Sequence, residues 1–89
     1  PTSYLMEEKM LSEVVKIASE NNIYIFCDEV YRYLEYDEKD RLPAICDLYE
    51  NGFSVGAMSK ALSLPGLIIG WTSTRNEKIL EKIAAYRDY

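Results

Sequence analysis

The chain has 89 residues, enough for one small domain, and Asp and Glu outnumber Lys and Arg by 15 to 10. The resulting net charge of -5 repels a phosphate backbone, so nucleic acid is not an expected partner. No apolar run approaches the roughly 18 residues of a membrane span, and no secretory signal opens the chain, so we expect a cytoplasmic protein without a membrane partner.

The sequence contains no histidine, which excludes Ser-His-Asp and Cys-His nucleophilic systems and every metal site that uses histidine. The two cysteines, Cys27 and Cys46, lack the spacing of a metal site, and we expect both to be reduced thiols. Cys27 lies in an apolar run, where a small buried hydrophobic side chain is the expected role. No metal ligands are therefore predicted.

The first two predicted elements are a helix and a strand. Residues 5–21 repeat apolar side chains at helical spacing, and Thr2 or Ser3 could cap the start of this amphipathic helix. The pair Asn21–Asn22 is a plausible stop. Residues 23–27, with the sequence IYIFC, are apolar at every position, which is typical of a strand covered on both faces by helices.

The middle of the chain is less regular. We expect a short helical turn at 29–36, a solvated loop at 37–43 and a second short helix at 44–50. Residues 53–59 then form the second predicted strand, in which Gly56 allows another part of the backbone to approach closely.

The last third of the chain predicts a return strand and a final helix. A turn at 62–67 contains a Pro-Gly pair, and residues 68–74 form the third strand. Asn76 caps a helix over 77–88, which we expect to bury its apolar face. That predicted face consists of Ile79, Leu80, Ile83, Ala84 and Tyr86.

These elements predict an α/β fold with about three strands and flanking helices. The long connection between the first two strands suits a parallel crossover, whereas the short link to the third suits an antiparallel return. Polar side chains follow the first two strands, namely Asp28 and Tyr31 after one and Ser59 and Lys60 after the other. Because ligands of open α/β sheets bind at the carboxyl ends of parallel strands, these groups could converge there.

Each of these residues also has an ordinary structural interpretation. An aspartate after a strand is often a turn residue, a lone lysine is usually a solvated charge, and Tyr31 is one of 8 tyrosines that could simply pack. No single residue is specific, but their order and spacing are. The segments IFCDEVYRYLEY, SVGAMSKALSLPGL and IIGW, with PTS at the start, resemble the class I/II aminotransferases, the fold-type-I enzymes that use pyridoxal 5′-phosphate (PLP).

The resemblance covers the whole chain and implies that residues 1–89 are a piece of the large PLP-binding domain. It implies that Lys60, in the Ser59–Lys60 pair, forms a Schiff base with PLP and then transfers protons. Asp28 would pair with the pyridine nitrogen, and Tyr31 would hydrogen-bond the phenolic oxygen of the ring. The implied reaction transfers an amino group from an amino acid to a 2-oxo acid, in a homo-oligomer.

Two positions depart from the family pattern, both on the phosphate side. Ile68 stands where the family has an arginine, and Ala57 stands where a serine or threonine is common. We interpret Ile68 as extending an apolar strand instead of binding an anion. The family's other phosphate and substrate groups lie outside this stretch, so we expect the chain to be an inactive fragment by itself.

Two alternatives remain open at this point. The same lysine, aspartate and tyrosine would serve another PLP enzyme on this scaffold, such as a C–S lyase, a decarboxylase or a cyclising synthase. The departures at Ile68 and Ala57 instead favour a non-catalytic relic or interaction module that keeps the lysine.

Overall fold

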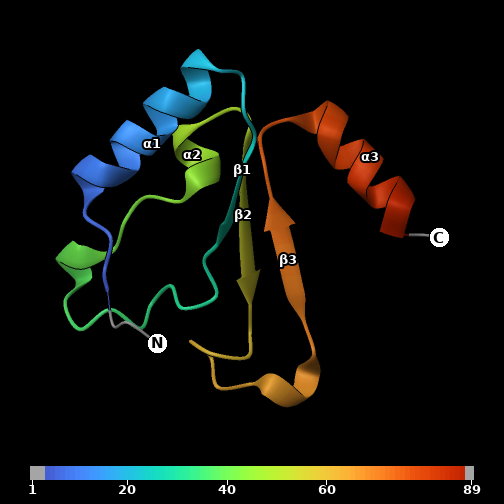
Figure 1. Cartoon of the computed structure of the whole chain (residues 1–89). Helices are drawn as coiled ribbons and strands as arrows, with labels where there is room; N and C mark the ends of the chain where they lie inside the picture. The colour runs from blue at the N-terminus through green and yellow to red at the C-terminus, as the bar shows by residue number, and fades with distance from the viewer. Residues whose placement is uncertain (1–3, 88–89) are drawn as a thin grey trace.

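The computed structural model describes residues 4–87 and shows a three-stranded mixed sheet with helices beside it (Figure 1). The strand order is β1-β2-β3, with β1 and β2 parallel and β2 and β3 antiparallel, as the sequence predicts. The elements in chain order are α1 (Glu8–Glu20), β1 (Ile25–Asp28), α2 (Ile45–Leu48), β2 (Gly52–Ala57), β3 (Gly70–Ser73) and α3 (Glu77–Arg87). Short 3₁₀ turns lie at Glu38–Asp40 and Pro65–Leu67.

The central strand β2 provides most of the small core. Phe53 is buried and its ring contacts Tyr24 edge to face, with ring centroids 6.0 Å apart. Gly56, also buried, pairs with Trp71 across the antiparallel ladder. A Cβ atom at Gly56 would lie 2.5 Å from the Trp71 indole, so the close neighbour of this glycine is a side chain and not the backbone segment that the sequence predicts.

Helix α1 is shorter than the predicted 5–21 and buries only part of the predicted apolar face. Among its residues, Leu11 and Ala18 are buried. The helix ends as predicted, because Asn22 adopts a left-handed conformation with φ 53° and the amide of Ile23 donates to the carbonyl of Ala18. At the start, Glu7 makes no capping bond through its side chain, and the predicted caps Thr2 and Ser3 lie outside the described residues.

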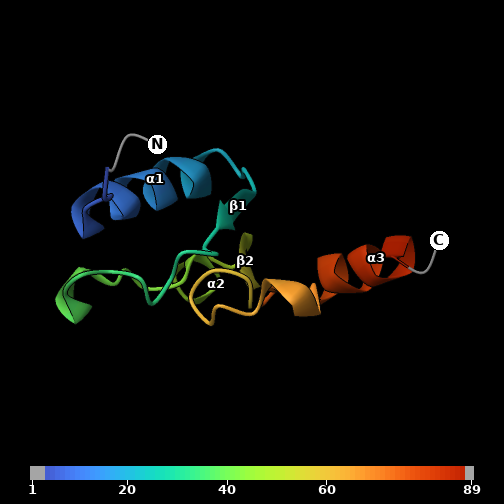
Figure 2. The ribbon, with the colours of Figure 1, turned by 90° about the horizontal axis from the view of Figure 1, so that it is seen from below.

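Helix α3 begins where the sequence predicts, but it does not pack as predicted. The Asn76 side chain accepts a hydrogen bond from the amide of Ile79 at 3.2 Å, so this cap is confirmed. No residue of α3 is buried, and Tyr86 is strongly exposed. Figure 1 shows α3 next to β3, and in both views α3 extends away from the strands on the side opposite α1 and α2 (Figures 1 and 2). In the described part of the chain, the apolar face of α3 is therefore exposed apart from the half-buried Ile79.

The predicted third strand begins too early. The structure starts β3 at Gly70, and Ile68 instead ends the 3₁₀ turn at Pro65–Leu67 in a left-handed conformation, with φ 52° and ψ 42°. Its side chain is 92% exposed. The interpretation of Ile68 as an extension of the apolar strand is therefore wrong, because a left-handed residue interrupts the extended backbone before the strand begins.

Candidate functional site

Lys60 and Tyr31 meet at the edge of the sheet where β1 and β2 both end. After β2, the chain folds back on itself through two hydrogen bonds, from the Ser63 amide to the Lys60 carbonyl and from the Leu64 amide to the Met58 carbonyl, both at 3.1 Å. This loop holds the Lys60 ammonium 5.9 Å from the centroid of the Tyr31 ring. That distance is within the range of a cation–π contact. The structure thus brings together two of the predicted site residues.

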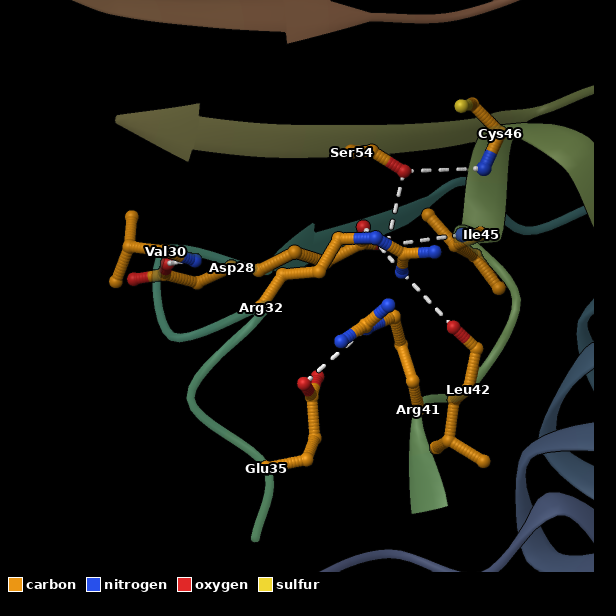
Figure 3. A network of polar contacts seen from close by, with 10 residues as sticks. Asp28, Val30, Arg32, Glu35, Arg41, Leu42, Ile45, Cys46 and Ser54 are labelled. Carbon is orange, nitrogen blue, oxygen red and sulfur yellow. Dashed lines mark hydrogen bonds and ion pairs between the residues drawn. The ribbon is translucent and has the colours of Figure 1, made fainter. Parts of the chain in front are cut away.

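Asp28 starts the turn that carries Tyr31 to this place. As the last residue of β1 it pairs in register with Val55, and its Oδ1 atom accepts a hydrogen bond from the amide of Val30 at 3.1 Å (Figure 3). This is the turn role expected of an aspartate after a strand. The turn continues with a bond from the amide of Arg32 to the carbonyl of Glu29 at 3.0 Å. Asp28 and Lys60 are both exposed at this sheet edge, whereas Ser59, which precedes Lys60 in the chain, is half-buried.

A polar cluster behind this turn is absent from the sequence-based prediction. The Glu29 Oε1 atom accepts hydrogen bonds from the Ile45 amide and from the Ser54 hydroxyl, each at 2.9 Å. Ser54 in turn accepts a bond from the Cys46 amide at 3.1 Å, as Figure 3 shows. The available signal was a second carboxylate directly after Asp28, together with a serine inside an apolar strand.

Two arginines extend this cluster toward the loop that follows. Arg32 lies 3.6 Å from the second carboxylate oxygen of Glu29 and donates to the Leu42 carbonyl at 2.8 Å (Figure 3). Arg41 pairs with Glu35 at 3.2 Å, and its guanidinium carbon lies 4.5 Å from the centroid of the Tyr33 ring. Both guanidinium groups are thus engaged within the protein, and neither is a free anion-binding group.

The surroundings of the turn shift the pKa values of two ionisable groups, Cys27 and Glu35. Burial, followed by the nearby carboxylates of Glu29 and Asp28, raises the pKa of the Cys27 thiol. Cys27 therefore stays protonated at neutral pH, but it is half-buried and not fully buried as the sequence predicts. For Glu35, burial alone would raise the pKa, but hydrogen bonds from its own backbone, from that of Tyr33 and from Arg41 lower it below the ordinary value.

The site itself is an open edge, not an enclosed cavity. A shallow pocket of about 70 Å³ lies next to it, and neither Asp28 nor Lys60 lines this pocket. Its walls include Glu29, Tyr33 and Trp71. We interpret this pocket as a packing gap beside the Trp71 ring, because the reactive side chains, Asp28 and Lys60, lie at the strand ends and do not line it.

Comparison with known proteins shows the family to which the chain belongs. The family model described as aminotransferase class I and II matches residues 1–88. The chain belongs to this family. It is 33% identical over 88 residues to an uncharacterized aminotransferase of Methanocaldococcus jannaschii, covering 97% of this chain and 20% of that protein. An aspartate aminotransferase of Pyrococcus horikoshii is 28% identical over 88 residues, covering 97% of this chain and 22% of the relative.

Solved aminotransferase structures share the fold. A PLP-dependent aminotransferase of Streptococcus suis superposes with a TM-score of 0.86 at 39% identity, over 100% of this chain and 23% of that one. The histidinol-phosphate aminotransferase of Clostridium acetobutylicum gives a TM-score of 0.80 at 28% identity, over 97% of this chain and 26% of that one. The 89-residue chain thus spans about a quarter or less of the length of these proteins. Within residues 4–87, no helix is long and apolar enough to cross a membrane.

Proposed function

We propose that residues 1–89 are part of the large PLP-binding domain of an aminotransferase that moves an amino group between an amino acid and a 2-oxo acid. The observation that carries the proposal is the contact of Lys60 with Tyr31, 5.9 Å from ammonium to ring centroid, at the sheet edge where Asp28 also ends a strand. Family membership supports it, because the matching solved structure from Streptococcus suis is named PLP-dependent.

The donor set at this edge suits the ring end of PLP. Asp28 uses Oδ1 for its own turn, and within residues 4–87 no hydrogen bond to Oδ2 is formed, so Oδ2 can accept a bond from a protonated pyridine nitrogen. The Tyr31 hydroxyl would donate to the phenolic oxygen of the ring, and Lys60, exposed at its tip, would hold the cofactor covalently. When bound, PLP supplies an electron sink for the bond broken at the substrate α-carbon.

With PLP bound, the Lys60 amine would be the group placed to move a proton at the substrate α-carbon. Asp28, at the end of its strand, would keep the pyridine nitrogen protonated. Tyr31 would serve both the ring oxygen and the lysine, because its ring already lies 5.9 Å from the Lys60 ammonium. These three roles need the two parallel strands to end side by side, as β1 and β2 do.

Neither the Ala57 nor the Ile68 side chain offers a hydrogen-bond donor to the phosphate end of PLP. Ala57 offers only a methyl group, and Ile68 extends an exposed apolar side chain. A charge-assisted hydrogen bond to phosphate contributes about 1.5–3 kcal/mol, so its loss weakens binding by roughly tenfold to a hundredfold. We therefore expect the isolated chain to hold PLP weakly and to show no measurable transaminase activity.

For the whole protein we further propose a cytoplasmic homo-oligomer whose partners are the amino acid and 2-oxo acid substrates. The two free thiols, Cys27 and Cys46, fit a reducing compartment. The homo-oligomer follows from the family resemblance.

The test is the site of attachment. The chain is incubated with PLP, reduced with borohydride and mapped by peptide mass spectrometry. Lys60 should carry most of the label, and Lys60→Ala should remove it, whereas Lys39→Ala should leave the pattern unchanged because Lys39 pairs with Asp37 on a distant loop. Label spread evenly over the lysines, or unaffected by Lys60→Ala, would contradict the proposal.

A further inference from the structure

Glu29 connects three parts of the fold that are far apart in sequence. One carboxylate oxygen accepts from the amide of Ile45, the first residue of α2, and from the hydroxyl of Ser54 in the middle of β2. The other oxygen faces the Arg32 guanidinium at 3.6 Å. With only 14% of its side chain exposed, Glu29 makes these contacts largely shielded from water, where charge-assisted bonds are strong.

The neighbours of Glu29 depend on it for their hydrogen bonds. Helix α2 has Ala44 as its N-cap, and Ala44 has no side-chain oxygen to cap it, so the amide of Ile45 is satisfied by a carboxylate 16 residues earlier. Ser54 is 7% exposed and completes the link to the Cys46 amide. Removing the carboxylate would leave buried donors without an acceptor.

Glu29 is also the residue between Asp28 and the turn that presents Tyr31. Its backbone amide donates to the carbonyl of Val55 at 2.9 Å, and its carbonyl accepts from the amide of Arg32 at 3.0 Å. The turn is therefore fixed to β2 through the backbone on one side and through the Glu29 carboxylate on the other. The turn follows Asp28 and carries Tyr31, whose ring centroid lies 5.9 Å from the Lys60 ammonium at the sheet edge.

We propose that Glu29 is a positioning residue of the candidate site, which through its bonds to Ser54 and the Ile45 amide holds Asp28 at the strand end and Tyr31 against Lys60. It touches neither substrate nor cofactor. The consequence for PLP attachment rests on the proposed function, whereas the effect on the Tyr31–Lys60 contact does not.

The experiment measures two things by NMR in the 89-residue chain, namely amide exchange at Ile45 and the ring-current shift that Tyr31 imposes on the Lys60 ε-methylene protons. Tyr31→Leu defines the shift when the ring is absent. In Glu29→Ala, exchange at Ile45 should rise by roughly tenfold or more, and the Lys60 shift should move to the Tyr31→Leu value. Glu29→Gln keeps an oxygen that can accept both bonds and should restore most of the wild-type shift. Glu13→Ala, on the exposed face of α1, is the matched control and should change neither.

Ser54→Ala keeps the test decisive if Glu29→Ala does not fold, because it removes one bond to the Glu29 carboxylate and retains the charge. In a folded Ser54→Ala chain, the Lys60 ε-methylene shift should move part of the way toward the Tyr31→Leu value. An unchanged Lys60 shift, either in a folded Glu29→Ala chain whose Ile45 amide exchanges faster or in a folded Ser54→Ala chain, would overturn the proposal, since Glu29 would then only cap α2.

PLP labelling of the same variants separates the role proposed for Glu29 from the proposed function. Folded Glu29→Ala or Ser54→Ala chains should lose the preference of PLP labelling for Lys60, and Glu29→Gln should regain it. If the wild-type chain is not labelled at Lys60 at all, the proposed function fails, and the NMR shifts alone decide the role of Glu29.

Discussion

Ile68 is held in a backbone conformation that its side chain disfavours. Its φ of 52° and ψ of 42° are left-handed, and a β-branched residue rarely adopts this region because Cβ approaches the following carbonyl. The side chain is 92% exposed, so packing within residues 4–87 does not offset the strain.

Replacing Ile68 by asparagine should therefore stabilise the chain. Asparagine tolerates the left-handed region, so Ile68→Asn should raise the free energy of unfolding by about 1 kcal/mol, measured by urea denaturation. Ile69→Asn is the control, since the φ of Ile69 is not positive. An equal gain in both variants would show that lower surface hydrophobicity, not backbone strain, is responsible.

Gly56 is required for a different reason, which is space and not backbone conformation. The indole of Trp71 covers it, and an added Cβ would lie 2.5 Å from the ring. At Gly66, in contrast, an added Cβ would meet no heavy atom within 4 Å, and neither glycine has a positive φ.

We expect Gly56→Ala to lower the free energy of unfolding by about 1–3 kcal/mol, because the Trp71 ring or the strand must shift. Gly66→Ala should be neutral or stabilising by about 0.4–1 kcal/mol, since it restricts only the unfolded chain. Thermal denaturation followed by Trp71 fluorescence compares the two. A neutral Gly56→Ala would show that the indole moves aside at no cost.

At the scale of elements, α3 depends on local bonds more than on packing. None of its residues is buried, and the Asn76 side chain caps it through the amide of Ile79 while its amide nitrogen bonds to Asn51 at 2.9 Å. Helices of this length are marginal without tertiary contacts.

Amide exchange in α3 should thus be much faster than in β2, and Asn76→Ala should accelerate it further, in line with a cap worth about 1 kcal/mol. Hydrogen–deuterium exchange with mass spectrometry measures both effects. Asn76→Asp, which retains the capping oxygen but loses the donor to Asn51, should reverse most of the acceleration caused by Asn76→Ala. Exchange in α3 as slow as in β2 would mean that α3 is covered, for instance by a second copy.

The loop between the turn and α2 carries a pH-sensitive pair. The pKa of Glu35 is lowered in the folded chain, despite burial, by backbone hydrogen bonds and by Arg41. The pair therefore stabilises the fold above the ordinary glutamate pKa of about 4.3, and this contribution is lost as the pH falls through the lowered value.

We expect stability to fall between roughly pH 5 and pH 3, and less steeply in Glu35→Gln, which has no charge to lose. Urea midpoints at a series of pH values test this. Glu38→Gln, in an exposed 3₁₀ turn, should keep the wild-type slope. If Glu35→Gln also keeps the wild-type slope, the Arg41 pair does not contribute in this range.

For the molecule as a whole, the exposed apolar surface is large for its size. Phe26 in β1 is 69% exposed and Trp71 in β3 is half exposed, and both strands are edges of the sheet. Unpaired strand edges and contiguous apolar side chains favour association with other chains.

The isolated 89-residue polypeptide should therefore self-associate at micromolar concentrations. Sedimentation velocity over a concentration series measures this, and Phe26→Lys on the edge strand should reduce it. Lys82→Ala on α3 is a control that leaves this edge unchanged. A clean monomer across the series would show that the exposed surface does not drive contact.

The sequence by itself determined the elements, their order and the groups at the strand ends. Helical periodicity, the Asn76 cap and the long first crossover depend on residues close in the chain, so local rules suffice for them. They correctly placed α3 after Asn76, made β1 and β2 parallel, and put Asp28 and Lys60 after neighbouring strands.

Only the tertiary structure decided which of these side chains have partners. The sequence did not single out Glu29 as the acceptor for α2, nor place Ile68 in a left-handed turn or the Trp71 indole over Gly56. It also overestimated the burial of α3. These features depend on how the whole chain packs. Whether a side chain is buried, and whether a polar group has a hydrogen-bond partner, cannot be read from the neighbouring residues in the sequence.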